Sequence, residues 1–356
     1  MSIYQAKVLV AGVAQRSRSL ILLGGMLGLC LNSTATAKDL GAPPPSLPTC
    51  DLLSRGPGVA LQNQEVLLHS VLSDFLDDLK NNRWEKLENY FHPRAKRTKD
   101  LGEKLRLLLQ NRYDTPWQFS VFRVWRIKIP SSGKAILDSC PESSGASVIA
   151  QYGYENQYMI WFQIMGQNEL GRLMLIMAPD KGKMYATALR LQQWSQQGED
   201  SEAWEQKGIT LAKAEQKIPA YFAFDVAQKL LAGEDPVVYP KQRKLLNTRD
   251  SIISQTELVK KLNEALKINS IAYIGSLLTK EGTGILIREV VQKQEPTAEL
   301  QKSCMSRGKA LMDLGWLTKG KEGLRCNYIF PGMNPDQDSQ MGGFYLAPED
   351  LINNKK

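Results

Sequence analysis

Residues 158–194 read YMIWFQIMGQNELGRLMLIMAPDKGKMYATALRLQQW, the most apolar stretch of the chain outside its N-terminus. Three runs rich in aromatic and β-favouring residues are separated by polar turns, one around Gly166 to Gly171 and one at Pro179 to Gly182. Short apolar runs with this punctuation are typical of β-strands. The stretch therefore predicts three antiparallel strands joined by short turns.

Helices are predicted upstream of these strands. From Glu65 to Lys80, apolar residues recur every three or four positions and leave the acidic residues on the other side, a pattern typical of an amphipathic helix. A short helix follows and stops at His92-Pro93, because a proline disfavours helix at the residue before it. A third helix is predicted from Leu101 to Asn111.

The spacing at which apolar residues recur then changes from that of a helix to that of a strand. Trp117, Phe119 and Val121 alternate with polar neighbours, and a second alternation opens at Arg123 and continues to Ile129. Period two predicts a strand with one buried face, and residues 147–154 predict another. Helices followed by strands predict an α+β domain in which the helices pack on one face of the sheet.

This order resembles a known superfamily. The first helix, the phrase NRWEKLENYFHP at residues 82–93 and the strands ending at Trp194 together resemble the nuclear-transport-factor-2-like (NTF2-like, cystatin-like) superfamily over residues 63–197. The resemblance implies a cone, in which a curved sheet wraps over the helices. Catalytic members usually place Asp, Tyr or His inside the cone, whereas the inward candidates in this chain are mostly aromatic. Such side chains either fill a core or line a pocket for an apolar ligand; the candidate lining residues are Tyr90, Trp125, Tyr154 and Trp161.

Residues 199–233 change character again. Six small and apolar residues fall at the relative spacing of one tetratricopeptide repeat: Trp204, Gly208, Leu211, Ala220, Phe224 and Ala227. A single repeat cannot form a solenoid. The segment is therefore predicted to be a helical hairpin that connects two domains, followed by a proline-containing linker at residues 235–240.

The remainder of the chain predicts a small α+β domain. A linker helix at residues 256–268 leads into strands at 271–278 and 284–291, and a helix at 298–314 precedes two short strands near 326–330 and 343–346. The predicted organisation is a signal peptide (1–37), a Pro/Gly-rich lead-in (38–62), the NTF2-like domain (63–197), the hairpin with its linker helix (198–268) and the C-terminal domain (269–356).

The N-terminus has the pattern of a secretory signal. Lys7, Arg16 and Arg18 precede the apolar run at residues 20–31, and Ala35-Thr-Ala37 supplies the small residues that signal peptidase requires. Without this segment the formal net charge falls from +8 to +5. We expect a mature chain that starts near Lys38 and is periplasmic or secreted. The alternatives are a lipoprotein anchored to the membrane through Cys30 and a signal that stays uncleaved.

Cysteine usage agrees with export. Four cysteines remain after Cys30, and an even number in an oxidising compartment predicts two disulfides, for which three connectivities exist. Proximity in sequence favours Cys304–Cys326, which leaves Cys50–Cys140. A metal site is rejected, because no pair has C-x-x-C spacing and the chain has two histidines.

No catalytic motif is recognisable. His69 lies in the first predicted helix and His92 ends the second, where a surface position is expected. The segment KEGTG at residues 280–284 lacks the lysine and hydroxyl residue of a phosphate-binding loop. No cofactor is therefore predicted, and export argues against a nucleic-acid partner. The sequence favours an exported bacterial envelope protein of non-catalytic binding or scaffolding type. The alternatives are a carrier of an apolar or lipid-like ligand and, least favoured, a small-molecule enzyme of the cone superfamily.

Overall fold

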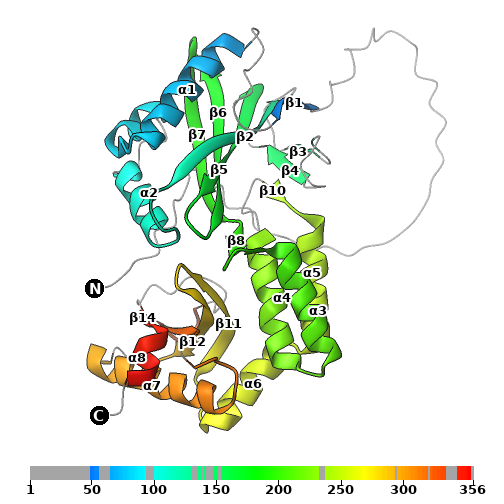
Figure 1. Ribbon diagram of the computed structural model, residues 1–356, viewed down its shortest axis with the longest axis vertical. Coiled ribbons are helices and arrows are strands. Elements are labelled where there is room, and N and C mark those ends of the chain that lie inside the picture. Colours follow the sequence, from blue (N-terminus) through cyan, green and yellow to red (C-terminus); the bar gives the residue numbers. More distant parts are fainter. Residues whose placement is uncertain are drawn as a thin grey trace, which may run out of the picture.

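The computed structural model describes residues 49–55, 65–93, 100–129, 135–137, 140, 147–150, 154–231, 237–292, 295–319, 321–333 and 343–353. They form an α+β protein, as predicted, with a five-stranded sheet, a group of helices and a four-stranded sheet (Figure 1). The predicted signal peptide and the Cys30 anchor fall outside the described residues.

The five-stranded sheet is antiparallel throughout and contains the predicted three-strand unit. In spatial order its strands are β1 (Thr49–Arg55), β2 (Gln118–Lys128), β5 (Asn156–Met165), β6 (Leu170–Asp180) and β7 (Lys183–Gln193). The first strand is a correction, because its segment was predicted to be an irregular lead-in. Thr49–Arg55 lies between the proline-rich and glycine-rich stretches and pairs antiparallel with β2, with a register shift between Leu52 and Ser54.

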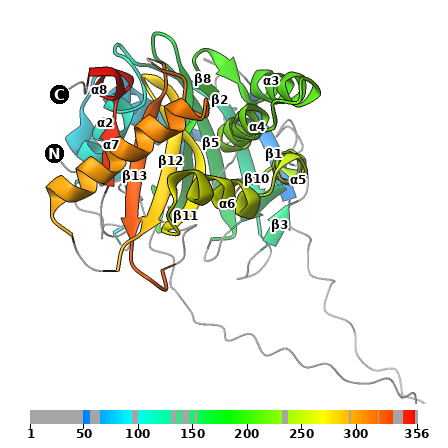
Figure 2. The ribbon, with the colours of Figure 1, turned by 90° about the horizontal axis from the view of Figure 1, so that it is seen from below.

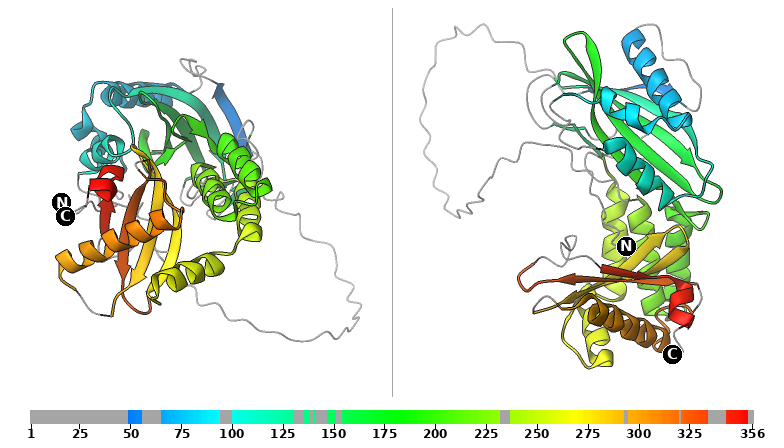
Figure 3. Two further views of the ribbon diagram at one scale, coloured as in Figure 1. Left: turned by 60° about the horizontal axis from the view of Figure 1, so that its bottom comes forward. Right: turned by 90° about the vertical axis from the view of Figure 1, so that its left-hand side faces the viewer.

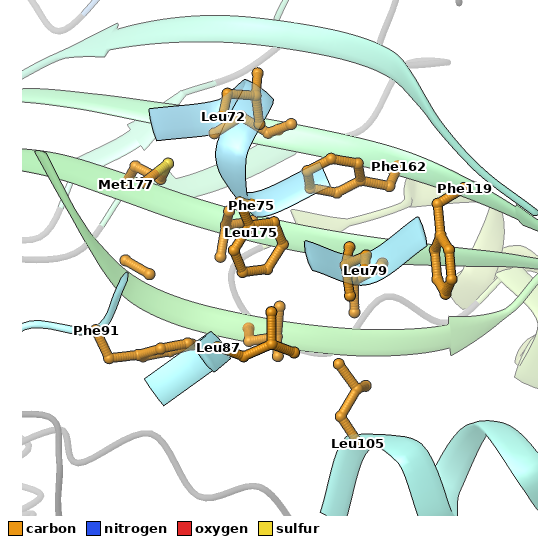
Figure 4. Close-up of a cluster of buried hydrophobic side chains, with 14 of the residues drawn as sticks. Leu72, Phe75, Leu79, Leu87, Phe91, Leu105, Phe119, Phe162, Leu175 and Met177 are labelled. Atoms are coloured by element: carbon orange, nitrogen blue, oxygen red, sulfur yellow. The ribbon is translucent and has the colours of Figure 1, made fainter. Parts of the chain in front are cut away.

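Helices cover one face of this sheet (Figures 1 and 3). They are α1 (Val66–Lys80), the 3-10 helix η2 (Trp84–Tyr90) and α2 (Leu101–Gln110). Leu68, Leu72, Phe75 and Leu79 form the buried stripe that the sequence predicts for α1. Figure 4 shows Phe75 of this stripe beside Leu175 of β6, within a cluster of buried apolar side chains.

The opposite face of the same sheet has its own buried cluster. Trp125, Met159, Trp161 and Met174 are buried there, together with Cys140 and Tyr239. Two short sheets lie beside this part of the chain: β10 (Val237–Val238), β4 (Ser147–Ala150) and β3 (Ala135–Leu137) form one, and β8 (Ser195–Gln196) and β9 (Glu199–Asp200) form the other. The predicted disulfide Cys50–Cys140 is present and ties β1 to this cluster.

Helices α3 (Ser201–Lys213) and α4 (Lys217–Leu231) form the predicted hairpin, which stands at the right in Figure 1, below the five-stranded sheet and beside the four-stranded one. Gly208 permits their close approach, because a Cβ there would come within 2.9 Å of the Phe224 ring. A third helix, α5 (Pro240–Ile252), packs on α4 and was not predicted. Its interior contains few apolar residues, although Pro240 at its first turn is a typical helix start.

The C-terminal domain confirms the predicted elements and adds a last helix. The predicted linker helix, α6 (Gln255–Leu266), leads into this domain. Its elements are β11 (Ile271–Thr279), β12 (Gly282–Val290), α7 (Thr297–Asp313), β13 (Gly323–Ile329), β14 (Gly343–Leu346) and α8 (Pro348–Asn353). The strand order is β11-β12-β13-β14, with β12 and β13 parallel because α7 connects them. Figure 2 shows α7 along one face of this sheet, where the predicted disulfide Cys304–Cys326 joins it to β13.

Candidate functional site

A polar recess lies on the outer side of α1 and η2. Its volume is about 290 Å³, and its lining consists of polar and charged side chains: Asp74, Asp77, Asp78, Arg83, Lys86, Asn89 and Tyr90. Helical spacing places Asp74 and Asp77 on the exposed side of α1, whereas Asp78 is buried beside the apolar stripe. The segment that follows α1 then brings Arg83 back against Asp77 and Asp78. Tyr90, one of the candidate lining residues, lines this recess, while its ring packs against the buried cluster beneath α1.

Asp78 forms the buried floor of the recess. Its carboxylate accepts hydrogen bonds from the Tyr90 hydroxyl, at 2.7 Å, and from the Arg83 guanidinium. Burial alone would raise the pKa of Asp78, but these two hydrogen bonds outweigh burial and hold the pKa below its ordinary value. Burial, with Asp78 nearby, raises the pKa of Tyr90. Asp78 is thus an ionised acceptor and Tyr90 a neutral donor at neutral pH.

Replacing Tyr90 by Phe tests this interaction. The ring contact with Phe75, at 5.2 Å between centroids, can persist, so the hydrogen bond to Asp78 is the principal loss. We expect the free energy of unfolding to fall by about 1–2 kcal/mol in urea titrations. Tyr185→Phe is the control: the Tyr185 hydroxyl has no hydrogen bond among the described residues, so its loss should change stability by less than about 0.5 kcal/mol. Equal effects of the two substitutions would contradict this role of Tyr90.

The recess also has ionic groups available to a partner. Within the described residues, no hydrogen bond or ion pair engages the side chains of Asp74 and Lys86, and both are exposed. The site therefore offers a free carboxylate and a free ammonium on either side of a fixed Asp78–Arg83 pair. This arrangement suits a polar partner that carries a basic group, with a hydrogen-bond acceptor or an anion nearby.

The other candidate lining residues lie elsewhere. Tyr154 precedes β5 and contacts the ring of His92, at 6.3 Å between centroids. His92 was expected at the surface but is buried, with Nε2 at 3.0 Å from Asp180 Oδ2 and the Tyr185 ring at 5.1 Å. The backbone bridge between Phe91 and Ala186 adds this segment to the edge of the sheet, which places the histidine against the turn between β6 and β7.

Trp125 and Trp161 are together, but on the face of the sheet opposite α1. Their rings meet edge to face at 4.6 Å. The strand register shifts between Val121 and Arg123, a β-bulge that moves later residues of β2 to the other face. The face that covers α1 is packed with Leu, Ile, Phe and Met side chains (Figure 4), so these tryptophans line no cavity beneath α1.

Arg172 occupies the centre of this opposite face. It lies 4.0 Å from the Trp161 ring, 5.2 Å from the Trp194 ring and 5.7 Å from the Tyr239 ring. Nη1 donates to the Tyr239 hydroxyl at 2.7 Å, and Nη2 donates to Gln192. Burial lowers the pKa of Arg172. Aromatic faces and neutral acceptors thus hold a buried cation at the point where the first domain meets the helices.

Asp225 of α4 is the most deeply buried charged side chain among the described residues, 1% exposed, and it is absent from the residues that the sequence pattern singled out. Its carboxylate accepts from Lys229 Nζ at 2.7 Å, from Arg249 Nη1 at 2.6 Å, and from the amide and hydroxyl of Ser276 at 2.7 and 2.6 Å. Burial alone would raise the pKa of Asp225, but Lys229 and Arg249 hold it far below its ordinary value.

The neighbours of Asp225 resemble a Ser–Lys catalytic pair, since Lys229 Nζ lies 3.1 Å from Ser276 Oγ. The hydrogen bonds argue against that role. Ser276 and Lys229 both donate to Asp225, and a carboxylate with so low a pKa takes up no proton. We therefore treat Asp225, Lys229, Arg249 and Ser276, the Asp225 cluster, as a joint between the hairpin and the C-terminal sheet.

No protein-family model, curated protein or solved structure matches the chain. Within the described ranges, no group of three or more His, Cys, Asp or Glu residues could hold a metal ion. A search of the same ranges finds no helix with the length and apolarity needed to cross a membrane. The geometry of the described residues is therefore the basis for a functional proposal.

Proposed function

We propose that the chain is an exported bacterial envelope protein that binds or holds a partner and does not catalyse a reaction. The supporting observation is the location of its deeply buried charges. Two of them, Arg172 and Asp225, lie where one part of the fold meets the next. Enzymes instead gather strongly perturbed ionisable groups at an open cleft, where substrate meets them.

These joints connect all three parts of the fold. Arg172 of the first domain binds Tyr239, which precedes α5, and Gln192 Nε2 donates to the carbonyl of Leu230 in α4 at 3.0 Å. Asp225 of α4 binds the backbone of β11. Gln196 Nε2 then donates to the carbonyl of Thr279 at 3.0 Å, which links the first domain directly to the C-terminal sheet. The joints favour a fixed arrangement of the parts, as a scaffold needs.

The polar recess is the surface that we assign to the partner. It is exposed, and Asp74 and Lys86 are available to a second molecule. The carrier alternative lacks this kind of support, because the described side chains between α1 and the sheet are closely packed. The two disulfides agree with an oxidising compartment. We therefore propose a periplasmic or secreted chain that starts near Lys38, or a lipoprotein anchored through Cys30.

Cross-linking in intact cells, followed by capture of the chain and mass spectrometry, tests the proposal. We expect a reproducible envelope partner, whose recovery falls about tenfold when Asp74 is replaced by Lys, equivalent to ~1.4 kcal/mol of binding free energy. The substitution reverses a charge in the recess without breaking a hydrogen bond. The N-terminal peptide of the captured chain shows in the same experiment whether it starts near Lys38 or at an acylated Cys30.

Glu85→Lys is the matched control. Glu85 is exposed in the neighbouring 3-10 helix and does not line the recess, so the same reversal of charge should leave partner recovery unchanged. Equal losses with both variants would assign the effect to net charge and contradict the recess as the binding surface. A chain that fractionates with the cytoplasm and captures no envelope partner would refute export and binding together.

A further inference from the structure

The polar recess has two kinds of charged side chain, those fixed within it and those left to a partner. Arg83 is fixed, because its guanidinium pairs with Asp77 and Asp78. Asp74 and Lys86 also line the recess, but among the described residues no hydrogen bond or ion pair engages either side chain. Both side chains are exposed. A second molecule can therefore meet one free carboxylate and one free ammonium without breaking an existing contact.

These two free charges come from α1 and η2, and they act on opposite ends of one hydrogen bond. The Tyr90 hydroxyl donates to Asp78 at 2.7 Å. Burial is the main cause of the raised pKa of Tyr90, and the charges of Asp78 and Asp74 add to it. Burial alone would raise the pKa of Asp78, whereas hydrogen bonds and nearby cations, Lys86 among them, lower it. Asp74 is therefore near the tyrosine end of this bond and Lys86 near the carboxylate end.

The spacing of the free charges sets the length of a ligand that can bind both. Asp74 precedes Asp78 by four residues of α1, which is about 6 Å along the helix axis. A cation beside Asp74 and an anion beside Lys86 are thus separated by roughly 6 Å. In a simple α-amino acid the ammonium nitrogen lies only about 2.5 Å from the carboxylate carbon, whereas in lysine six bonds place the side-chain ammonium up to about 7 Å away. The flexible stem of Lys86 can take up the remaining difference.

We propose that the polar recess binds a residue with a basic side chain and a free carboxylate, as a lysine at the C-terminus of a peptide has. The ammonium of the ligand pairs with Asp74, and its carboxylate pairs with Lys86. Asn89, also exposed in the recess, can hydrogen-bond to the peptide backbone. The volume of about 290 Å³ is at the lower end for ligand sites, which suits one residue and not a longer segment. The inference rests on the proposed function, since it names the chemistry of the partner assigned to this surface.

Nα-acetyl-lysine is the probe, because its acetyl group replaces the rest of the peptide and leaves both charges in place. Titration into the isotope-labelled mature chain, followed by NMR, should shift the amide signals of α1 and η2. We expect saturation with a dissociation constant on the order of 1 mM, which is near the ceiling for a ligand of this size. Nα-acetyl-lysine amide lacks the carboxylate and Nα,Nε-diacetyl-lysine lacks the ammonium, so each should bind about fivefold more weakly or worse.

Two substitutions assign the charges of the probe to their partners. Asp74→Asn and Lys86→Gln should each weaken binding of Nα-acetyl-lysine about fivefold, and neither breaks a contact of the folded chain. With Asp74→Asn, acetylating the probe's ammonium should change affinity by less than about twofold further, because the partner of that group is already absent. Glu85→Gln is the matched control, since Glu85 is exposed on η2 and does not line the recess. It should leave affinity unchanged.

Three results would overturn the proposal: no saturable shift of these amides, equal affinity for the three lysine derivatives, or indifference to both Asp74→Asn and Lys86→Gln. Tighter binding of phosphoethanolamine than of Nα-acetyl-lysine would assign the recess to a lipid headgroup and overturn the peptide assignment. The proposed function can fail separately. Binding of Nα-acetyl-lysine by a chain that captures no envelope partner would refute that function and leave this inference standing. Capture that depends on Asp74, without binding of the probe, would do the reverse.

Discussion

Replacing Asp225 by Asn is expected to destabilise the fold by about 3–5 kcal/mol, the usual result of removing one partner from a buried ion pair. The substitution leaves Lys229 and Arg249 beside a neutral amide and weakens the bonds from Ser276. Urea unfolding should show the loss as a lower midpoint. Hydrogen exchange should locate it at the amides of β11, where Asp225 meets the C-terminal sheet.

Asp250→Asn is the control for this prediction. Asp250 contacts the same guanidinium of Arg249, but its side chain is 48% exposed, so its removal should cost no more than about 1 kcal/mol. Because the folded pKa of Asp225 is depressed, its contribution is complete above the unfolded pKa of about 3.9 and is lost as pH falls below that value. In acid, the native chain should therefore lose the stability that ionised Asp225 contributes. The Asp225→Asn chain lacks this contribution at every pH. Parallel pH profiles for the two chains would contradict this.

Replacing Leu68 by Ala should cost about 2–5 kcal/mol, since Leu68 is completely buried between α1 and the five-stranded sheet. The expected cost combines the lost burial of the side chain with the cavity that it leaves in a closely packed core. Urea unfolding of the purified chain measures it. A large loss would also support the absence of spare volume beneath α1, on which our preference for a binding or scaffolding role over a ligand carrier depends.

Leu67 provides a control one position away. Its side chain is 42% exposed on the same helix, so Leu67→Ala removes the same atoms with the same change in helix propensity. We expect a change of no more than about 0.5 kcal/mol. If both leucines proved equally tolerant of Ala, the space beneath α1 would be able to adapt, and a ligand could enter it.

Local pattern was sufficient to predict most elements of the fold. The apolar stripe of α1, the three strands of residues 158–194 and the hairpin all have periodicities that their own segments display. The segment of α5 lacked such a stripe, since Leu245 is its one fully buried residue. Thr49–Arg55 is short, and its partner strand β2 lies more than 60 residues away in the sequence. Local pattern therefore could not reveal this pairing.

The faces of the sheet were harder to predict than its strands. One extra residue near position 122 moves every later side chain of β2 to the other face of the sheet. Trp125 therefore lies on the face opposite the predicted cone. The sequence did show the change, because the alternation restarts at Arg123. That restart was interpreted as a continuation of the strand and not as a bulge.

The Asp225 cluster could not be predicted from local pattern. Its members come from α4, α5 and β11, and tertiary packing alone brings them together. One local signal existed, since Asp225 interrupts the apolar run YFAFDVA at residues 221–227 and Lys229 follows four positions later. An acid within the buried face of a helix requires partners, and that requirement predicts a joint without revealing its other side.

The two disulfides have a consequence for the order of assembly. In the chain from Lys38 onward, Cys50 and Cys140 are the first two cysteines and Cys304 and Cys326 are the last two, so each bond joins neighbours in sequence. On the route of export that we propose, the chain would cross the membrane from its N-terminus and present its thiols in this order. An oxidant that links each thiol to the next one to emerge then forms the native pairs directly, and thiol–disulfide exchange has no wrong pairing to correct.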